Sequence, residues 1–421
     1  MEHALVDLRE QADLAALGRE MARQGLGKRQ RRAYVAASLA RLAARSQAPL
    51  RAFLAAERRA GRVRAVAGFS VTNRLAVEAL PATLASLAKR PDVAAVLPAA
   101  VALDSALAAE AEPDPLATQQ TPEKTSWALT ALSAGAAWRQ GLDGSGVVVG
   151  IIDTGASAVH EQLAAGFRGG SRAWLDPAGG SVTPLDSRFG HGTGVLSCAV
   201  GRNTAGFSLG VAPRAQWIAC AGLPAGRYDP LLVSRCAEWM LHTGQPDVLI
   251  AAWLLPADGC DRSLQRIVDA WRAAEILPVF AAGNHGPGAS TDRSPANYTG
   301  LYPGDRPDRA ALSVGGLGRD GAPLPESSRG PGRCGGAGFP LLAAPAEDLV
   351  TAFPLTSSLY RRARGTSFAA GLVAGAAALL VQSDPEASVS DLEDALTGSG
   401  TAPGRLDVAD ALARLRQRKR R

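Results

Sequence analysis

Cysteine is scarce in this chain of 421 residues and forms no recognisable metal motif. The five cysteines are Cys198, Cys220, Cys236, Cys260 and Cys334. Their spacings match no pattern of zinc ligands, so we predict no metal site built on cysteine. An odd count leaves at least one thiol unpaired, which favours a reducing compartment.

No secretory leader is visible at the start of the sequence, and no membrane-type apolar run of full length is expected. The first ten residues contain no basic region followed by an apolar stretch. We therefore expect a cytoplasmic protein, with export by a non-classical route as the alternative. The charge-free run from Phe368 to Val381 has fourteen residues, fewer than the roughly 20 that a membrane helix needs. We predict a buried core helix there and no transmembrane segment.

The net charge of +6 is distributed unevenly along the chain. Residues 1–125 carry 18 basic and 13 acidic side chains, residues 126–413 carry 21 and 26, and residues 414–421 carry 6 and none. A basic module that faces an acidic one gains association rate and orientation. The basic tail at 414–421 could attract nucleic acid or anionic lipid. The simpler interpretation is a solvated helix end, and we expect no nucleic-acid partner.

Periodicity predicts a small α+β domain over residues 1–103. We expect the first helical region to be interrupted by the basic stretch 25–32 and by Pro49. The order β-α-β-β-α-β is that of ferredoxin-like domains. The expected elements are a strand at 3–8, a helical region to about residue 60, strands at 63–71 and 74–79, a helix at 81–90 and a strand at 93–97.

A linker and a second domain follow. Residues 104–125 lose periodicity and collect prolines and acids, which is typical of an exposed linker. Over residues 126–413 strands alternate with helices, which predicts a doubly wound α/β domain with a mostly parallel sheet. In such sheets reactive residues gather at the carboxyl ends of strands. Asp153 and Asn284 follow predicted strands at 147–153 and 277–283.

Ser367 stands at the start of the predicted core helix, in the segment Gly365-Thr-Ser-Phe-Ala-Ala370. The first turn of a helix has unpaired N–H groups and a partial positive charge, which stabilise an oxyanion. A serine nucleophile fits this position. An ordinary capped core helix is the alternative, because serine is common at helix starts. Gly371 and Gly375 are spaced to let another backbone approach.

A serine nucleophile needs a base, and the base needs an acid to orient it. Of the five histidines, His191 alone lies in a glycine-framed segment that opens a helix, and His285 beside Asn284 is its competitor. Asp153 ends an apolar strand, where an unpaired carboxylate would be costly. We therefore expect Asp153 to have a partner.

Three separated segments resemble those of subtilisin-like serine peptidases, the subtilases. They are Val149-Gly-Ile-Ile-Asp-Thr-Gly155, His191-Gly-Thr193 and Gly365-Thr-Ser-Phe-Ala-Ala370. Their order, Asp then His then Ser, is also that of subtilisin. The resemblance covers about residues 120–412 and implies a subtilisin-like serine endopeptidase acting on proteins or peptides. It assigns Asp153 as the orienting acid, His191 as general base and then acid, and Ser367 as nucleophile.

The resemblance also implies an oxyanion donor and a substrate wall. Asn284, in Ala281-Ala-Gly-Asn-His-Gly286, resembles the family asparagine that binds the oxyanion, although a plain turn residue is the alternative. Gly283 before it lets substrate lie close. Where relatives usually have Ser-Leu-Gly on the strand that pairs with substrate, this chain has Ala252, Trp253 and Leu254. Bulk thus replaces glycine at one wall of the primary pocket, so substrate choice is expected to differ.

Calcium is a common companion of this family, but the usual ligands look absent. Gln162 and Thr204 stand where relatives often have an aspartate and an asparagine. Calcium needs several oxygen ligands, preferably charged. We therefore predict that this site is weak or absent and that the chain needs no cofactor.

The N-terminal module resembles the inhibitory propeptides of the family, which fold on a ferredoxin-like plan and plug the cleft. The chain would then be made as a self-inhibited precursor, with its own N-terminal domain as an intramolecular inhibitor. A permanent accessory domain is the alternative. A second alternative, outside enzymes, is a subtilase-like binding module whose narrowed pocket no longer admits substrate.

Overall fold

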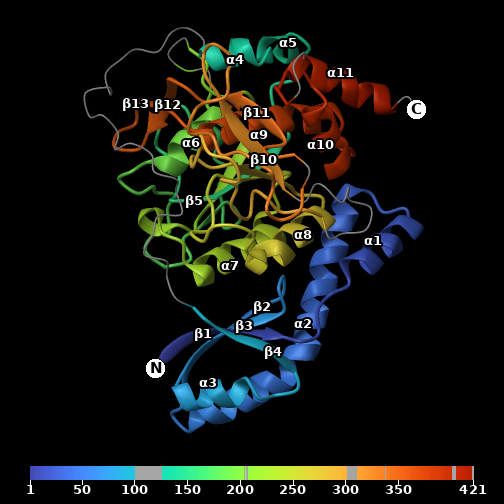
Figure 1. Cartoon of the computed structure of the whole chain (residues 1–421), viewed down its shortest axis with the longest axis vertical. Helices are drawn as coiled ribbons and strands as arrows, with labels where there is room; N and C mark the ends of the chain where they lie inside the picture. Colours follow the sequence, from blue (N-terminus) through green and yellow to red (C-terminus); the bar gives the residue numbers. More distant parts are fainter. Residues whose placement is uncertain are drawn as a thin grey trace.

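The computed structural model describes residues 1–99, 126–202, 204, 207–300, 311–336, 338–400 and 404–419. These residues form a smaller α+β domain at the N-terminus and a larger α/β domain; in Figure 1 the sheet of the smaller domain lies below the larger domain, and α1 and the start of α2 lie beside α8. The predicted linker at 104–125 lies outside the described residues, as do the last two residues of the basic tail.

The N-terminal domain has the predicted ferredoxin-like order. Its four strands pair antiparallel in the order β2-β3-β1-β4. The predicted interruption at Pro49 is wrong, because the second helix runs through this proline. The basic stretch 25–32 is only partly a break, because the second helix begins at Lys28. The elements are β1 (Glu2–Leu8), α1 (Leu14–Arg23), α2 (Lys28–Arg59), β2 (Val63–Phe69), β3 (Arg74–Ala79), α3 (Pro81–Leu87) and β4 (Val93–Pro98).

The larger domain is built on a seven-stranded parallel sheet in the order β11-β10-β9-β8-β5-β7-β6. This confirms the predicted doubly wound α/β class. The strands are β5 (Val148–Asp153), β6 (Trp174–Leu175), β7 (Gln216–Ala221), β8 (Val248–Ala251), β9 (Leu277–Ala281), β10 (Leu312–Leu317) and β11 (Leu342–Pro345), with a separate hairpin of β12 (Leu349–Phe353) and β13 (Leu359–Ala363). The helices are α4 (Trp127–Ala131), α5 (Ala134–Trp138), α6 (His191–Val200), α7 (Pro230–Trp239), α8 (Gln265–Ala273), α9 (Thr366–Ser383), α10 (Val389–Thr397) and α11 (Val408–Lys419).

Helices cover both faces of this sheet, and alternate residues of a strand face opposite layers. In β5, Ile151 belongs to the core that contains α6 and α9, whereas Ile152 belongs to the core that contains α7 and α8. The second core also includes Met21 and Leu39 of the N-terminal domain. The two domains therefore share one apolar cluster on the α7–α8 side of the sheet.

The central helix α9 begins at Thr366 and is buried over nearly its whole length. Its 18 residues exceed the predicted apolar run, and among the described residues it is the helix whose length and apolar composition would suffice to span a bilayer. However, 89% of this stretch is buried inside the protein. A Cβ on Gly371 would lie 2.4 Å from the carbonyl oxygen of Val195 in α6, so the predicted close approach is observed.

The last helix, α11, continues across the predicted boundary between residues 413 and 414. Within it, Arg414 pairs with Asp410 at 3.0 Å, and Arg418 pairs with Asp391 of α10 at 2.9 Å. The described part of the basic tail is therefore the end of a helix on the larger domain, with some of its charge matched by neighbouring carboxylates.

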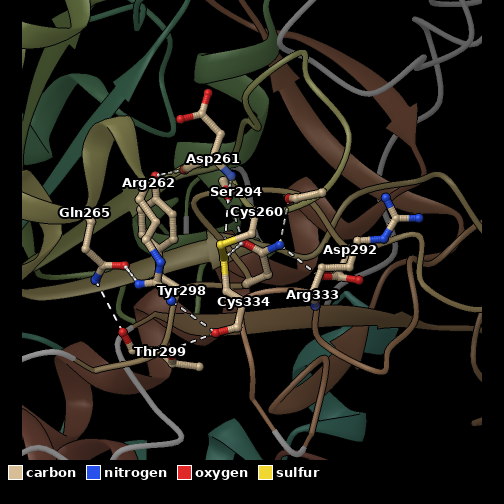
Figure 2. The surroundings of a disulfide bond; sticks show 12 residues. Cys260, Asp261, Arg262, Gln265, Asp292, Ser294, Tyr298, Thr299, Arg333 and Cys334 are labelled. Carbon is tan, nitrogen blue, oxygen red and sulfur yellow. Dashed lines mark hydrogen bonds between the residues drawn. A yellow bond between two sulfur atoms is a disulfide. The ribbon is translucent and has the colours of Figure 1, made fainter.

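Four of the five cysteines form disulfides, Cys220–Cys236 and Cys260–Cys334. Figure 2 shows the second, which joins two loops of the larger domain. The carbonyl oxygen of Cys334 accepts hydrogen bonds from Arg262 at 3.2 Å and Thr299 at 3.0 Å, so one side of the bridge is fixed by further contacts. The predicted unpaired thiol is Cys198. The two disulfides remove the argument for a reducing compartment.

The unpaired thiol should be inert in the folded protein. Cys198 lies in α6 under α9, and burial raises the pKa of its thiol to about 12. Because the thiolate is the reactive form, we expect no reaction with a thiol reagent at pH 8 in the native protein. Denaturation without reductant should expose one thiol per chain, and reduction should expose all five. Three or more thiols after denaturation alone would contradict the disulfide pairing.

Candidate active site

Asp153 and His191 are joined by a short hydrogen bond. Asp153 is the last residue of β5 and is fully buried, and His191 is the first residue of α6. The Nδ1–H of His191 donates to Asp153 Oδ1 at 2.6 Å, and the backbone N–H of Thr154 donates to the same oxygen at 2.7 Å. The predicted partner of the buried carboxylate is confirmed. With Nδ1 protonated in this way, Nε2 is the nitrogen able to accept a proton.

Ser367 lies beside this pair because the helices α6 and α9 start together. Gly194 of α6 lies next to the Phe368 ring, Gly371 faces Val195, and Gly375 faces Ala199, so the two helices run parallel and in register from their first turns. The rings of His191 and Phe368 are 6.0 Å apart between centroids. Ser367 is buried in the first turn of α9, and its Oγ lies 3.4 Å from the carbonyl oxygen of Ala252.

Asn284 is held in a fixed orientation next to this serine. Its Oδ1 accepts hydrogen bonds from the backbone N–H of Thr366 at 3.1 Å and from the Thr366 hydroxyl at 3.0 Å. The Nδ2 group is thereby turned towards Gly365, where a Cβ would lie only 2.9 Å from it. Gly365 has φ 132°, which favours glycine. This arrangement fits an amide that donates to an oxyanion, together with the Ser367 N–H at the helix start.

Comparison with known proteins identifies the family. Residues 144–411 match the subtilase family. The chain is a subtilase. Subtilases are hydrolases that act on peptide bonds, and this chain belongs to that class of enzymes.

Three relatives illustrate how far this similarity extends. Bacillopeptidase F of Bacillus subtilis is 29% identical over 402 residues, which are 88% of this chain but 27% of that protein. Subtilisin BL of Lederbergia lenta is 31% identical over 67% of this chain and 93% of its own length. Subtilisin E of Bacillus subtilis is 28% identical over 67% of this chain and 68% of that protein. The chain thus spans about a quarter of bacillopeptidase F, and of these three matches that one is long enough to extend into the N-terminal domain.

Of the three residues predicted to form the substrate wall, two lie beside Gly283 or Ser367 and one does not. The Leu254 side chain faces Gly283, because a Cβ on that glycine would lie 2.5 Å from Leu254 Cδ1. Ala252 contacts Ser367 through its carbonyl oxygen. The prediction for the Trp253 side chain is wrong: its indole donates to the carbonyl oxygen of Ile152 at 2.8 Å and packs in the α7–α8 core. These residues follow the end of β8 at Ala251, and the bond to Ile152 holds the indole in the core, whereas the Leu254 side chain, in the same apolar cluster, also reaches Gly283.

Removing the Asn284 amide should impair the transition state and spare the fold. We expect Asn284→Leu to lower kcat of this subtilase by about 10²- to 10³-fold with little change in KM, the range that the corresponding change gives in subtilisin. Steady-state kinetics on a peptide substrate measures both constants. His285→Gln is the matched control, because His285 is the neighbouring residue and the rival of His191 for the role of base. A greater loss with His285→Gln than with Asn284→Leu would contradict the assignment.

Asp186 is a site residue that sequence reasoning missed. One carboxylate oxygen accepts from the Thr154 hydroxyl at 2.6 Å, and the other accepts from the Thr193 hydroxyl at 2.6 Å and the Thr193 N–H at 2.7 Å. Burial of the carboxyl group raises the pKa of Asp186, and these hydrogen bonds oppose that shift. Asp186 thereby joins the residue after Asp153 to the second residue after His191. The sequence signal that could have found Asp186 is an acidic residue five positions before the glycine-framed His191.

Loss of this brace should reduce turnover without removing any reacting group. Since a displacement of about 1 Å can cost about 10²-fold in rate, we expect Asp186→Ala to lower kcat by up to about 10²-fold. KM should change much less, because Asp186 holds the triad and does not line the substrate wall. Asp176→Ala, in an exposed turn, is the control. If a folded Asp186→Ala protein had an unchanged kcat, Asp186 would not position the triad.

The residues at the common calcium position do not form a good ligand set. The Gln162 amide donates to the Thr204 hydroxyl at 2.6 Å and to the Tyr360 hydroxyl at 3.2 Å, and its buried carbonyl oxygen, Oε1, makes no hydrogen bond within the described part of the chain. The nearby Glu161 carboxylate accepts from Tyr360. One amide oxygen and hydroxyls do not supply the six to eight oxygens that Ca²⁺ prefers. We assign no catalytic step to a metal.

Proposed function

We propose that this subtilase is a serine endopeptidase that hydrolyses proteins through an acyl-enzyme. The observation that carries the proposal is the buried Asp153–His191 hydrogen bond at the start of α6, in register with Ser367 at the start of α9. A base oriented by a carboxylate beside a serine at a helix start is the arrangement that serine acyl transfer requires. The family match supports the same reaction class.

The chemistry follows from the positions of these groups. Ser367 Oγ attacks the peptide carbonyl carbon as His191 Nε2 takes its proton, and the carbonyl oxygen becomes an oxyanion that Asn284 Nδ2 and the Ser367 N–H stabilise. Collapse of this intermediate breaks the C–N bond, and His191 gives its proton to the leaving amine. Water then repeats the sequence on the ester and releases the acid. Asp153 takes no proton in these steps and holds the imidazole in one tautomer.

A protein substrate tests this proposal against the binding-module alternative. The chain is cut at the linker, and the N-terminal fragment is dissociated at high salt and removed. The larger domain is then incubated with an unfolded protein, and the new termini are identified by mass spectrometry. Cleavage within the substrate that disappears in Ser367→Ala supports an endopeptidase. Release of single residues from one end would point to an exopeptidase. Stable binding without any new terminus would favour the binding module. The observation that supports this alternative is the Leu254 side chain beside Gly283.

We further propose that the N-terminal domain is an intramolecular inhibitor in a self-inhibited precursor. Its turn between β2 and β3 docks on α7, where the Glu238 carboxylate accepts from the N–H groups of Ser70 at 2.8 Å and Val71 at 3.0 Å. The opposite net charges of the two domains support such docking. Catalysis that rises when the two domains are separated distinguishes an inhibitor from the accessory-domain alternative.

Localisation, cofactors and other partners are also proposals. The two disulfides support function in an oxidising compartment, so we favour export over the cytoplasmic expectation. We propose little or no dependence on calcium, because the Gln162 and Thr204 groups bond to each other. We do not propose nucleic acid as a partner, since Arg418 of the basic tail is paired with acids of α10.

A further inference from the structure

The first turn of α2 carries a cluster of cations in a position that does not favour them. Lys28 is its first residue, Arg31 and Arg32 follow, and no acid lies in this turn. Cations at a helix N-terminus oppose the partial positive charge of the helix end. Lys28 and Arg32 are nonetheless only 6% and 8% exposed. Partners outside the helix must therefore compensate for both the position and the burial.

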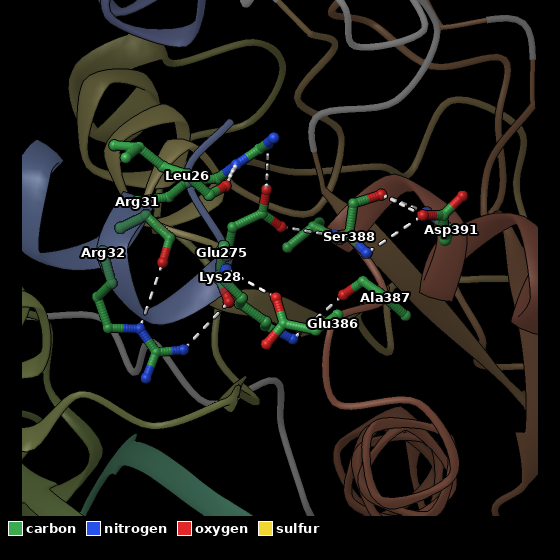
Figure 3. A network of polar contacts seen from close by, with 12 residues as sticks. Leu26, Lys28, Arg31, Arg32, Glu275, Glu386, Ala387, Ser388 and Asp391 are labelled. Carbon is green, nitrogen blue, oxygen red and sulfur yellow. Dashed lines mark hydrogen bonds and ion pairs between the residues drawn. The ribbon is translucent and has the colours of Figure 1, made fainter. Parts of the chain in front are cut away.

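Those partners belong to the larger domain, and Figure 3 labels Glu275, Glu386 and Ala387 among them. Arg32 donates to the carbonyl oxygens of Gln245 at 2.9 Å, Glu275 at 3.2 Å and Ala274 at 3.3 Å, and to Asp247 Oδ1 at 3.3 Å. Burial lowers the pKa of Arg32, and Asp247 opposes that shift. A guanidinium that makes four such bonds is a specific contact between two surfaces and not a mobile surface pair.

Three more contacts between the domains complete the same patch. The Glu386 carboxylate accepts from the backbone N–H of Lys28 at 3.0 Å, so the larger domain supplies an acid at the start of α2. The Lys28 ammonium donates to the carbonyl oxygen of Ala387 at 3.3 Å. Arg31 pairs with Glu275 at 3.2 Å, and the other oxygen of Glu275 accepts from the N–H of Val389 at 2.9 Å.

This patch lies at the amino edge of the parallel sheet, opposite the triad. Asp247 and Glu275 precede β8 and β9, whereas Asp153 ends β5. Asp247 also accepts from the N–H of Val148 at 3.0 Å, and its carbonyl oxygen accepts from Leu277 at 3.0 Å. Arg32 thus contacts a residue that ties together the starts of three adjacent central strands, β5, β8 and β9. Occupation of the active-site cleft plays no part in this contact.

We propose that Asp247, Glu275 and Glu386 form a docking site, the amino-edge site, for the first turn of α2. It holds the N-terminal domain on the larger domain independently of the cleft, so the two remain one particle when the connection between them is cut. The shared apolar cluster, with Met21 and Leu39 against α8 and its neighbours, supplies the non-polar part of the same interface. The inference deepens the proposed inhibitor role of the N-terminal domain and rests on it for its biological consequence.

The test measures attachment without catalysis. A recognition sequence for a specific external protease is placed within residues 104–125 of the Ser367→Ala chain, which is then cut and analysed by size exclusion. We expect the two fragments to elute together. The rate at which the N-terminal fragment dissociates is measured after immobilising the larger fragment. Arg32→Gln should raise this rate by about 10²- to 10³-fold, because it leaves buried acceptors and Asp247 without their cation.

Matched variants keep the result interpretable. Arg29→Gln removes an exposed cation one turn away and should leave dissociation unchanged. Arg32→Lys keeps the charge but not the planar fork, so it should dissociate faster than the parent and more slowly than Arg32→Gln, and it serves if Arg32→Gln does not fold. Equal dissociation rates for the parent, Arg32→Lys and Arg32→Gln would overturn the amino-edge site.

A second readout separates this inference from the inhibitor proposal. The same cut is made in the chain that retains Ser367, and hydrolysis of a small peptide substrate is followed. If the fragments stay together while turnover is full, the amino-edge site is supported and the inhibitor role fails. If the fragment leaves the Ser367→Ala chain at once while the uncut active chain remains inhibited, the amino-edge site is overturned and the inhibitor role stands.

Discussion

Replacing Ser367 by alanine is expected to lower kcat by about 10⁶-fold, the size of the effect of the corresponding change in subtilisin. The reason is that the substitution removes the nucleophile, so His191 has no serine proton to take. Steady-state kinetics with a peptide substrate, or single-turnover kinetics at high enzyme concentration, measures the residual rate. The oxyanion donors remain, so a small rate above that in water should persist.

The loss should not come from unfolding. Within the described part of the chain the Ser367 hydroxyl makes a long hydrogen bond to the Ala252 carbonyl oxygen, so the free energy of unfolding should change by less than about 1 kcal/mol. Ser383→Ala, at the other end of α9, is the matched control and should retain full activity. If the Ser367→Ala protein kept more than about 1% of kcat, the assignment of Ser367 as nucleophile would be wrong. Contamination with the parent enzyme would be far below that level.

Replacing Asp153 by asparagine is expected to lower kcat by about 10⁴-fold, as the equivalent change does in other triad proteases. Asp153 Oδ1 accepts from both His191 Nδ1 and the Thr154 N–H, and an amide cannot reproduce this at both places without favouring the wrong imidazole tautomer. KM should change little because Asp153 is buried behind the histidine.

Kinetics at several substrate concentrations separates these two constants for Asp153→Asn. Asp258→Asn, an acid whose side chain is 72% exposed and which pairs with Arg293, is the control for loss of one negative charge. If Asp153→Asn changed KM strongly and kcat little, the carboxylate would be a binding group, and the proposed orientation of His191 would be wrong.

The residues that react were predictable because each has a local signature. Asp153 ends an apolar strand, His191 is framed by glycines, and Ser367 precedes an apolar helix. Asn284 follows a strand in the same way. Short-range pattern and position at strand ends made these residues candidates, and the resemblance to subtilases assigned their roles.

The features that were missed depend on residues far apart in the chain. The partners in the Cys260–Cys334 disulfide are 74 residues apart, and spacing alone does not determine such pairs. Asp186 acts through a loop that folds back on α6, so its hydrogen bonds to Thr154 and Thr193 exist only in the folded domain.

The start of α2 shows how tertiary contacts override local preference. The sequence predicts an interruption of the helical region over residues 25–32, and a break does lie between the end of α1 at Arg23 and the start of α2. The helix begins within this stretch, at Lys28, because Glu386 and Asp247 of the larger domain compensate for the cations of its first turn. The prediction for Trp253 failed for a different reason: a hydrogen bond from its indole to the carbonyl oxygen of Ile152, 101 residues earlier in the chain, holds the side chain in the core.

The central claim, that folding makes Ser367 a nucleophile with His191 as its base, is tested most directly by covalent labelling with a small fluorophosphonate. The full chain and the larger domain, cut within residues 104–125 and freed of its N-terminal fragment at high salt, are treated, and the labelled peptide is identified by mass spectrometry. We predict a single adduct, on Ser367, whose formation is lost in His191→Ala. An adduct on another serine, or no adduct in either folded form, would contradict the account.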